Sequence, residues 1–227
     1  MGRELSRVKL PVFIFDFGGV VIKWKSNDPI FDGIAERYAV PREELRRYFE
    51  AQLPELEAGD ISMREFLVRA LAKFGKQLRK GDSPDRLWTE PFERLVKFRS
   101  GTVKMIESLR RRGYKVYLFS NTSLPHVRLF KRMGWDRMVD GFLTSCELGS
   151  TKPSPEAFER ALGVIGVDRS RVVFIDDKRE NVEGAKRFGM GWALWFTSLR
   201  RLKEDIAPIV GARGQEAAKS QKPTVTP

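Results

Sequence analysis

The sequence predicts an α/β fold, a doubly wound parallel sheet with an inserted all-helical subdomain. From Gly101 onward, strand-like and helix-like segments alternate, as expected when helices return the chain between parallel strands. Between Asp28 and Phe98 only helical periodicity occurs, so an all-helical segment separates the first strand from the rest of the series. A chain of 227 residues is long enough for one such core with an insertion.

The first strand is predicted at residues 12–15, where a continuous apolar run is typical of a strand buried on both faces. The insertion is expected to contain four helices, at residues 30–38, 43–52, 63–74 and 85–95. The later elements are expected in this order: helix 102–112, strand 114–119, helix 125–133, strand 138–143, helix 155–165, strand 171–175, helix 179–188 and strand 192–195.

These elements divide the chain into three expected parts. A Rossmann-like core comprises residues 8–24 and 97–199, and residues 25–96 form a helical cap over the carboxyl ends of the strands. After the last strand the alternation stops. Residues 207–227 are rich in Pro, Gly, Ala, Lys and Gln and show no apolar face, so we expect residues 203–227 to be a disordered tail.

Composition and charge narrow the classes of function. Cys146 is the single cysteine, which excludes an internal disulfide and favours a reducing, cytoplasmic setting. No apolar run is long enough to cross a bilayer, so we expect no membrane partner. The net charge is +12, but the basic residues are spread over several helices and no recognition motif occurs, so we expect no nucleic-acid partner. We expect a monomer or a homodimer.

Polar residues follow several predicted strands at the point where each strand ends. Asp16 follows the first strand and precedes two glycines, which let the backbone turn sharply and approach a ligand closely. Ser120 and Asn121 follow the second strand, and the pair Asp176-Asp177 follows Ile175. Each motif alone is commonplace, since turns and helix caps use the same residue types. Parallel strands, however, bring their carboxyl ends to one edge of the sheet, where ligands bind.

Taken in order, Asp16 with its glycines, Ser120-Asn121-Thr122, Lys152-Pro153 and Asp176-Asp177 resemble the four signature motifs of the haloacid-dehalogenase-like hydrolase superfamily. The resemblance covers roughly residues 12–196. It implies subfamily I, with a helical cap that shields the reaction and shapes the substrate pocket. It also implies a Mg²⁺-dependent phosphatase acting on a small phosphorylated metabolite.

The resemblance assigns roles to individual residues. Asp16 would attack phosphorus to give an aspartyl-phosphate, and Lys152 would neutralise the phosphate and help to orient Asp16. Ser120 and Asn121 would hydrogen-bond the phosphoryl oxygens. The ligands of Mg²⁺ would be Asp16, the main-chain carbonyl of Gly18, Asp176 and Asp177, completed by water.

Gly18 departs from the usual pattern of this superfamily, in which phosphatases carry an aspartate that protonates the leaving group. One interpretation is the sugar-phosphate branch resembling glucose-1-phosphate phosphatases, where a glycine occupies this position. His126, the single histidine, could then transfer a proton or contact the substrate. A second interpretation is a non-catalytic protein that binds a phosphorylated ligand or partner. A third is a 2-haloacid dehalogenase, although residues 21–28 contain no arginine to hold a halide and the acid pair is retained.

Overall fold

The computed structural model describes residues 10–24 and 26–219, with side chains as far as residue 211. Five parallel strands form one sheet in the order β3-β2-β1-β4-β5. The strands are β1 (Val12–Phe15), β2 (Lys115–Ser120), β3 (Gly141–Thr144), β4 (Val172–Asp176) and β5 (Trp192–Trp195). The strand that comes first in the sequence therefore lies in the middle of the sheet, between β2 and β4.

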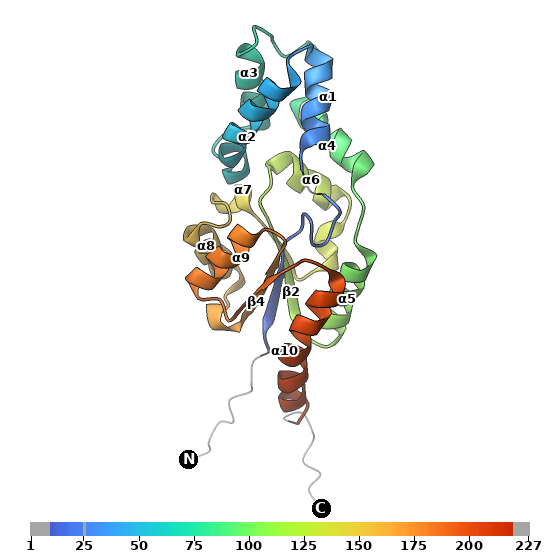
Figure 1. The fold of residues 1–227 in the computed structure, drawn as a ribbon, viewed down its shortest axis with the longest axis vertical. Helices are drawn as coiled ribbons and strands as arrows, with labels where there is room; N and C mark the ends of the chain where they lie inside the picture. Colours follow the sequence, from blue (N-terminus) through green and yellow to red (C-terminus); the bar gives the residue numbers. More distant parts are fainter. Residues whose placement is uncertain (1–9, 25, 220–227) are drawn as a thin grey trace, which may run out of the picture.

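Helices cover both faces of this sheet (Figure 1). The helices of the core are α5 (Ser100–Arg111), α6 (Leu124–Arg132), α7 (Ser145–Leu148), α8 (Pro155–Ile165), α9 (Arg179–Phe188) and α10 (Leu199–Lys219), with 3-10 turns at Trp135–Met138 and Arg169–Arg171.

Successive side chains of β1 point to opposite faces of the sheet, as the pleat requires. Phe13 and Phe15 belong to the apolar cluster that includes residues of α5, α6 and α10. Ile14 belongs to the opposite cluster, which includes residues of α8 and α9. All three side chains are fully buried. The predicted doubly wound α/β architecture is thus confirmed.

Among the described residues between β1 and α5, the named elements are all helices, and they lie beyond the carboxyl ends of the strands (Figure 1). These helices are α1 (Asp28–Tyr38), α2 (Arg42–Ala58), α3 (Met63–Ala72) and α4 (Pro84–Leu95). An aromatic cluster holds them together, in which Phe49 stacks on Phe66 at 4.8 Å and Trp88 meets Phe66 edge-on at 5.4 Å. The helical cap is confirmed, while its limits at residues 25 and 96 stay a prediction.

Helix α2 is longer than the sequence predicted. It was expected to end at residue 52, but it continues through Pro54 to Ala58 and closes at Gly59, whose φ is 83°. A proline in a helix removes one backbone hydrogen bond. Burial of Leu56 and docking of the end of the helix against α7 compensate for that loss. The added turn carries the cap down to the strand tips.

The expected tail from residue 203 is wrong for the described residues. Helix α10 runs from Leu199 to Lys219, and it buries Leu202, Ile206, Ile209 and Val210 against the core. Their spacing places them on one side of a helix, an apolar face that the composition of the segment concealed. The tyrosine hydroxyl of Tyr114 also donates to the carbonyl of Val210 at 3.2 Å. Residues 220–227 lie outside the described residues.

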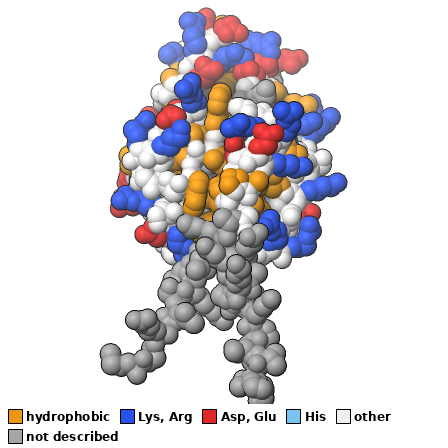
Figure 2. All heavy atoms as spheres, turned by 60° about the horizontal axis from the view of Figure 1, so that its bottom comes forward, with side chains coloured by type: hydrophobic (Ala, Val, Ile, Leu, Met, Phe, Trp, Pro, Cys, Tyr) orange, Lys and Arg blue, Asp and Glu red, His pale blue; other side chains and the backbone are white. Residues whose placement is uncertain are grey.

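The surface carries the excess positive charge without concentrating it on the face that Figure 2 shows. Lys and Arg side chains are spread over that face, with Asp and Glu side chains among them. The absence of a nucleic-acid partner stays a prediction. Among the residues that the structure describes, no helix is long and apolar enough to span a membrane.

Candidate functional site

The strand tips bring the predicted polar residues to one edge of the sheet. In the strand register, Phe15 lies opposite both Leu118 and Ile175, so β1, β2 and β4 end at nearly the same level. The backbone N–H of Asp16 extends this pairing by donating to the carbonyl of Ile175 at 2.7 Å. Residues that lie far apart in the sequence therefore meet beside Asp16.

Lys152 is the centre of this arrangement. Its ammonium group donates to Asp16 Oδ1 at 2.7 Å, to Asp176 Oδ2 at 2.8 Å and to the carbonyl of Phe119 at 2.7 Å. All three hydrogens of the ammonium group are thus used in hydrogen bonds within the protein, and the side chain is only 1% exposed. Asn121, the residue after β2, fixes the backbone of Lys152, because its amide N–H donates to the Lys152 carbonyl at 2.8 Å and its oxygen accepts the Lys152 N–H at 2.9 Å.

Three carboxylates surround the tip of β1. Oxygens of Asp16, Asp176 and Asp177 all lie within 4.8 Å of one another. Asp176 is fully buried, and it accepts hydrogen bonds from the side chain of Asn181 at 2.9 Å and from the backbone N–H of Lys178 at 2.8 Å. Clustered hard oxygen ligands are the donor set that Mg²⁺ and Ca²⁺ prefer.

The backbone at Gly19 allows this cluster to form. Its φ is 77°, a left-handed conformation that favours glycine. A Cβ atom at this position would stand 1.9 Å from Oδ2 of Asp177. At Gly18, by contrast, the nearest neighbour of an added Cβ is the carbonyl oxygen of Trp24 at 3.7 Å. The second glycine is therefore required by the acid cluster, whereas space for a side chain exists at the first.

The electrostatics of the cluster favour a cation. Burial raises the pKa of Asp16 to about 7; Lys152 opposes the rise and Asp176 adds to it. Burial and Asp176 also raise the pKa of Asp177. Burial disfavours the charge on Lys152, but the carboxylates of Asp16 and Asp176 outweigh it and raise its pKa. One lysine leaves the acid cluster with excess negative charge, which a divalent cation would neutralise.

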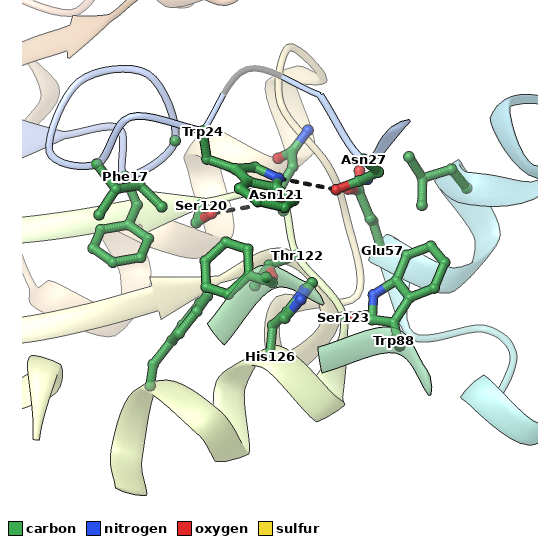
Figure 3. Close-up of a pocket in the computed structure, with 15 residues that line it drawn as sticks. Phe17, Trp24, Asn27, Glu57, Trp88, Ser120, Asn121, Thr122, Ser123 and His126 are labelled. Carbon is green, nitrogen blue, oxygen red and sulfur yellow. Dashed lines mark hydrogen bonds between the residues drawn. The ribbon is translucent and has the colours of Figure 1, made fainter. Parts of the chain in front are cut away.

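Two adjoining cavities lie between the strand tips and the cap. The larger has a volume of about 350 Å³ and is lined by Asp16, Ser120, Asn121 and Lys152 from the core. It is lined by α1 and α2 on the cap side. The smaller cavity, of about 70 Å³, continues between α4 and α6 (Figure 3). The predicted phosphate-binding residues therefore open onto a space of the size of a small metabolite.

The smaller cavity carries polar atoms that the protein itself leaves unpaired. The indole N–H of Trp88, the hydroxyl of Ser123 and Nε2 of His126 are buried, and none has a hydrogen-bond partner among the described residues. Figure 3 shows these three side chains around one space, with Trp88 from the cap and the other two from the core. Buried polar groups are rarely left unpaired, so a polar ligand or water fits between them.

His126 lies in aromatic surroundings rather than at the phosphate-binding edge. Its ring is 4.6 Å from Phe92 and stacks parallel to Phe130 at 5.8 Å. Burial lowers the pKa of His126 to about 3, so the ring is neutral at physiological pH. Of the two roles considered for it, contact with the substrate fits this position and donation of a proton does not.

A cap residue that the sequence did not single out also faces this space. Glu57, near the end of α2, lines both cavities. No motif surrounds it, and it lies beyond the predicted end of its helix. Only the extra turn of α2 brings it to the site.

Comparison with known proteins places the chain in a family. A family model described as haloacid dehalogenase-like hydrolase matches residues 10–189, and the chain belongs to this family of hydrolases.

Two curated relatives align with this chain over most of their own length. Flavin mononucleotide hydrolase 1 of Arabidopsis thaliana is 25% identical over 213 residues, covering 92% of this chain and 81% of the relative. D-ribitol-5-phosphate phosphatase of Bacteroides thetaiotaomicron is 29% identical over 190 residues, covering 78% and 87%.

Solved structures share the fold. A HAD family enzyme from Bacteroides thetaiotaomicron, crystallised with magnesium and inorganic phosphate, superposes with a TM-score of 0.64 at 22% identity, covering 80% of this chain and 92% of that one. A HAD phosphatase from Thermococcus onnurineus superposes with a TM-score of 0.61 at 18% identity, covering 87% and 98%.

Proposed function

We propose that this protein is a Mg²⁺-dependent phosphatase that hydrolyses a small phosphorylated metabolite through an aspartyl-phosphate on Asp16. The observation that carries this proposal is the bridge that Lys152 makes between Asp16 and Asp176, at 2.7 and 2.8 Å, where Asp16 and Lys152 line the larger cavity. A carboxylate held this way is oriented for attack, and the ammonium lies where a phosphate needs positive charge. The phosphatase names of curated relatives support the same reaction.

Each residue of the site would have its own role in the reaction. Asp16 attacks phosphorus, and Lys152 holds one of its carboxylate oxygens so that the other is free. Ser120 and Asn121 donate hydrogen bonds to the phosphoryl oxygens. Mg²⁺, held by Asp16, the Gly18 carbonyl, Asp176 and Asp177, would neutralise charge on the phosphoryl group.

The unpaired polar atoms support a hydroxylated substrate. Trp88, Ser123 and His126 offer a donor, a hydroxyl and a neutral imidazole on the wall of the smaller cavity. A site built to hydrogen-bond hydroxyl groups loses affinity for analogues that lack them. We therefore propose that the organic half of the substrate is a polyol or a sugar, in keeping with the resemblance to sugar-phosphate phosphatases.

The test is phosphate release from a panel of sugar phosphates, acyl phosphates and p-nitrophenyl phosphate, with Mg²⁺ or with EDTA. We expect metal-dependent release by the wild type and loss of release in Asp16→Asn. Asp205→Asn is the matched control, because this aspartate pairs with Arg201 on α10 at 3.0 Å. Equal release by Asp16→Asn and the control would refute the nucleophile.

Gly18 favours one alternative, a protein that binds a phosphorylated ligand or partner without turnover, since glycine supplies no acid for the leaving group. Such a protein would bind phosphate esters in both the wild type and Asp16→Asn and release phosphate in neither. A dehalogenase would instead release chloride from a 2-haloacid without added metal. The cytoplasmic location and the monomeric or homodimeric state stay predictions.

A further inference from the structure

The two core residues considered for proton transfer, Gly18 and His126, do not supply the proton that the proposed reaction needs. When Asp16 displaces an alkoxide, the leaving oxygen needs a proton, and loss of such a donor costs about 10²–10⁴-fold in rate. Gly18 has no side chain to supply it. His126 is neutral at physiological pH, because burial lowers its pKa to about 3. The following inference rests on the phosphatase function proposed above.

The end of α2 is held against the core at this point. The buried hydroxyl of Ser145 donates to the main-chain carbonyl of Glu57 at 2.5 Å and accepts the backbone N–H of Thr122 at 2.9 Å. Two residues further on, a Cβ atom at Gly59 would stand 2.6 Å from the carbonyl oxygen of Cys146. Glu57 is therefore positioned by direct contact between cap and core, and not by the cap alone.

The side chain of Glu57 faces the reaction space. It lines the larger cavity together with Asp16 and Lys152, and it lines the smaller cavity together with Gly18. Figure 3 shows it beside Asn27, on the cap side of the opening. Among the residues that the structure describes, its carboxyl group has no hydrogen-bond or ion-pair partner.

The protonation of Glu57 suits proton transfer. Burial raises its pKa to about 7, and Lys178 and Lys152 oppose the rise. The other charged groups that line the larger cavity are Glu50 on the same helix, Asp28 at the start of α1, and Asp16 and Asp177 at the strand tips. At neutral pH both the acid and the carboxylate forms of Glu57 are populated.

We propose that the carboxyl group of Glu57 is the general acid and base of the reaction, in place of a side chain at position 18. In-line displacement puts the leaving oxygen on the side of phosphorus opposite Asp16, which is the side that faces the cap. The Asp16 Oδ–P bond forms, the P–O bond to the alcohol breaks, and the proton of Glu57 goes to the alcohol. In the second step Glu57 takes a proton from water, the water oxygen bonds to phosphorus, and the Oδ–P bond breaks.

The leaving group distinguishes this role from binding. We expect Glu57→Gln to lower kcat/KM for an alkyl phosphate by about 10²–10⁴-fold, and for p-nitrophenyl phosphate by less than about tenfold, since nitrophenolate leaves without a proton. The phosphoenzyme should accumulate in this variant with p-nitrophenyl phosphate, because the water is no longer activated. Glu55→Gln is the matched control, with the same charge change on the same helix, where Glu55 pairs with Arg69.

Rescue provides a second measurement. An added Cβ at Gly18 has no neighbour closer than 3.7 Å, so we expect the protein to accommodate Gly18→Asp. In the Glu57→Gln background, Gly18→Asp should raise the rate of alkyl phosphate hydrolysis at least about tenfold over that of Glu57→Gln alone. Equal losses on both substrates without rescue, or no loss at all, would overturn the role of Glu57 while leaving the phosphatase intact. Absence of release by the wild type from every ester would overturn the proposed function itself.

Discussion

Replacement of Glu57 by glutamine should make the protein more stable than the wild type at alkaline pH and leave its stability unchanged in acid. The folded state raises the pKa of Glu57 from 4.5 to about 7, mainly through burial. Between these values the folded state binds more protons than the unfolded state, so the free energy of unfolding of the wild type falls as pH rises. Glutamine has no proton to lose, and the variant escapes this fall.

The size of the effect follows from the shift. At 1.36 kcal/mol per pKa unit, a rise from 4.5 to about 7 corresponds to roughly 3 kcal/mol. Because Glu57 is half-buried and solvent reaches it through the cavity, we expect about 1–2 kcal/mol at about pH 8 and no difference at about pH 4, below both pKa values.

The assay is urea unfolding of the wild type, Glu57→Gln and Glu55→Gln at several pH values between these limits, in EDTA. The pKa values of Asp16 and Asp177 are also raised by folding, but these two aspartates are common to all three proteins, so their contribution cancels in the difference. A constant difference between Glu57→Gln and the wild type across pH would refute the reasoning, because it would mean that the carboxyl of Glu57 is not perturbed by folding.

Three further predictions follow from the packing. Gly19→Ala should lower the free energy of unfolding by about 1–2 kcal/mol and weaken Mg²⁺ binding, because the added Cβ strains the backbone and displaces Asp177. Urea unfolding and Mg²⁺ titration measure these two effects. In the same assays, Gly18→Ala should change the free energy of unfolding by less than half as much. Lys152→Met should abolish phosphate release and destabilise the protein by about 3–5 kcal/mol in urea, because two buried carboxylates lose their cation; wild-type stability would contradict this. Ile209→Ala should lower the free energy of unfolding, measured in urea, by about 2–4 kcal/mol, because Ile209 is buried against the core. The same substitution in a disordered tail would leave the free energy of unfolding unchanged.

Local patterns were enough to predict the core and the floor of the site. A short apolar run predicts a buried strand, and the residue that follows the run then lies at the end of that strand. Asp16, Ser120 and Asp176 were placed in this way, and the structure brings them to one edge of the sheet. A strand pattern cannot place Lys152, because this residue lies in a loop. Its role was predicted from the resemblance to a family, and its hydrogen bonds to the carboxylates of Asp16 and Asp176 give the physical reason for that role.

The succession of strands and helices along the chain, the helical character of the cap and the group of residues at the strand tips could be predicted from the sequence, because each depends on residues close together in the chain. The tertiary structure alone decided the rest. Helix α10 is folded because its apolar side packs against the core. Helix α2 continues beyond Pro54 because its end packs against α7. Glu57 reaches the cavity, and the polar atoms of Trp88 and His126 face it, through contacts between residues distant in sequence, which no local pattern records.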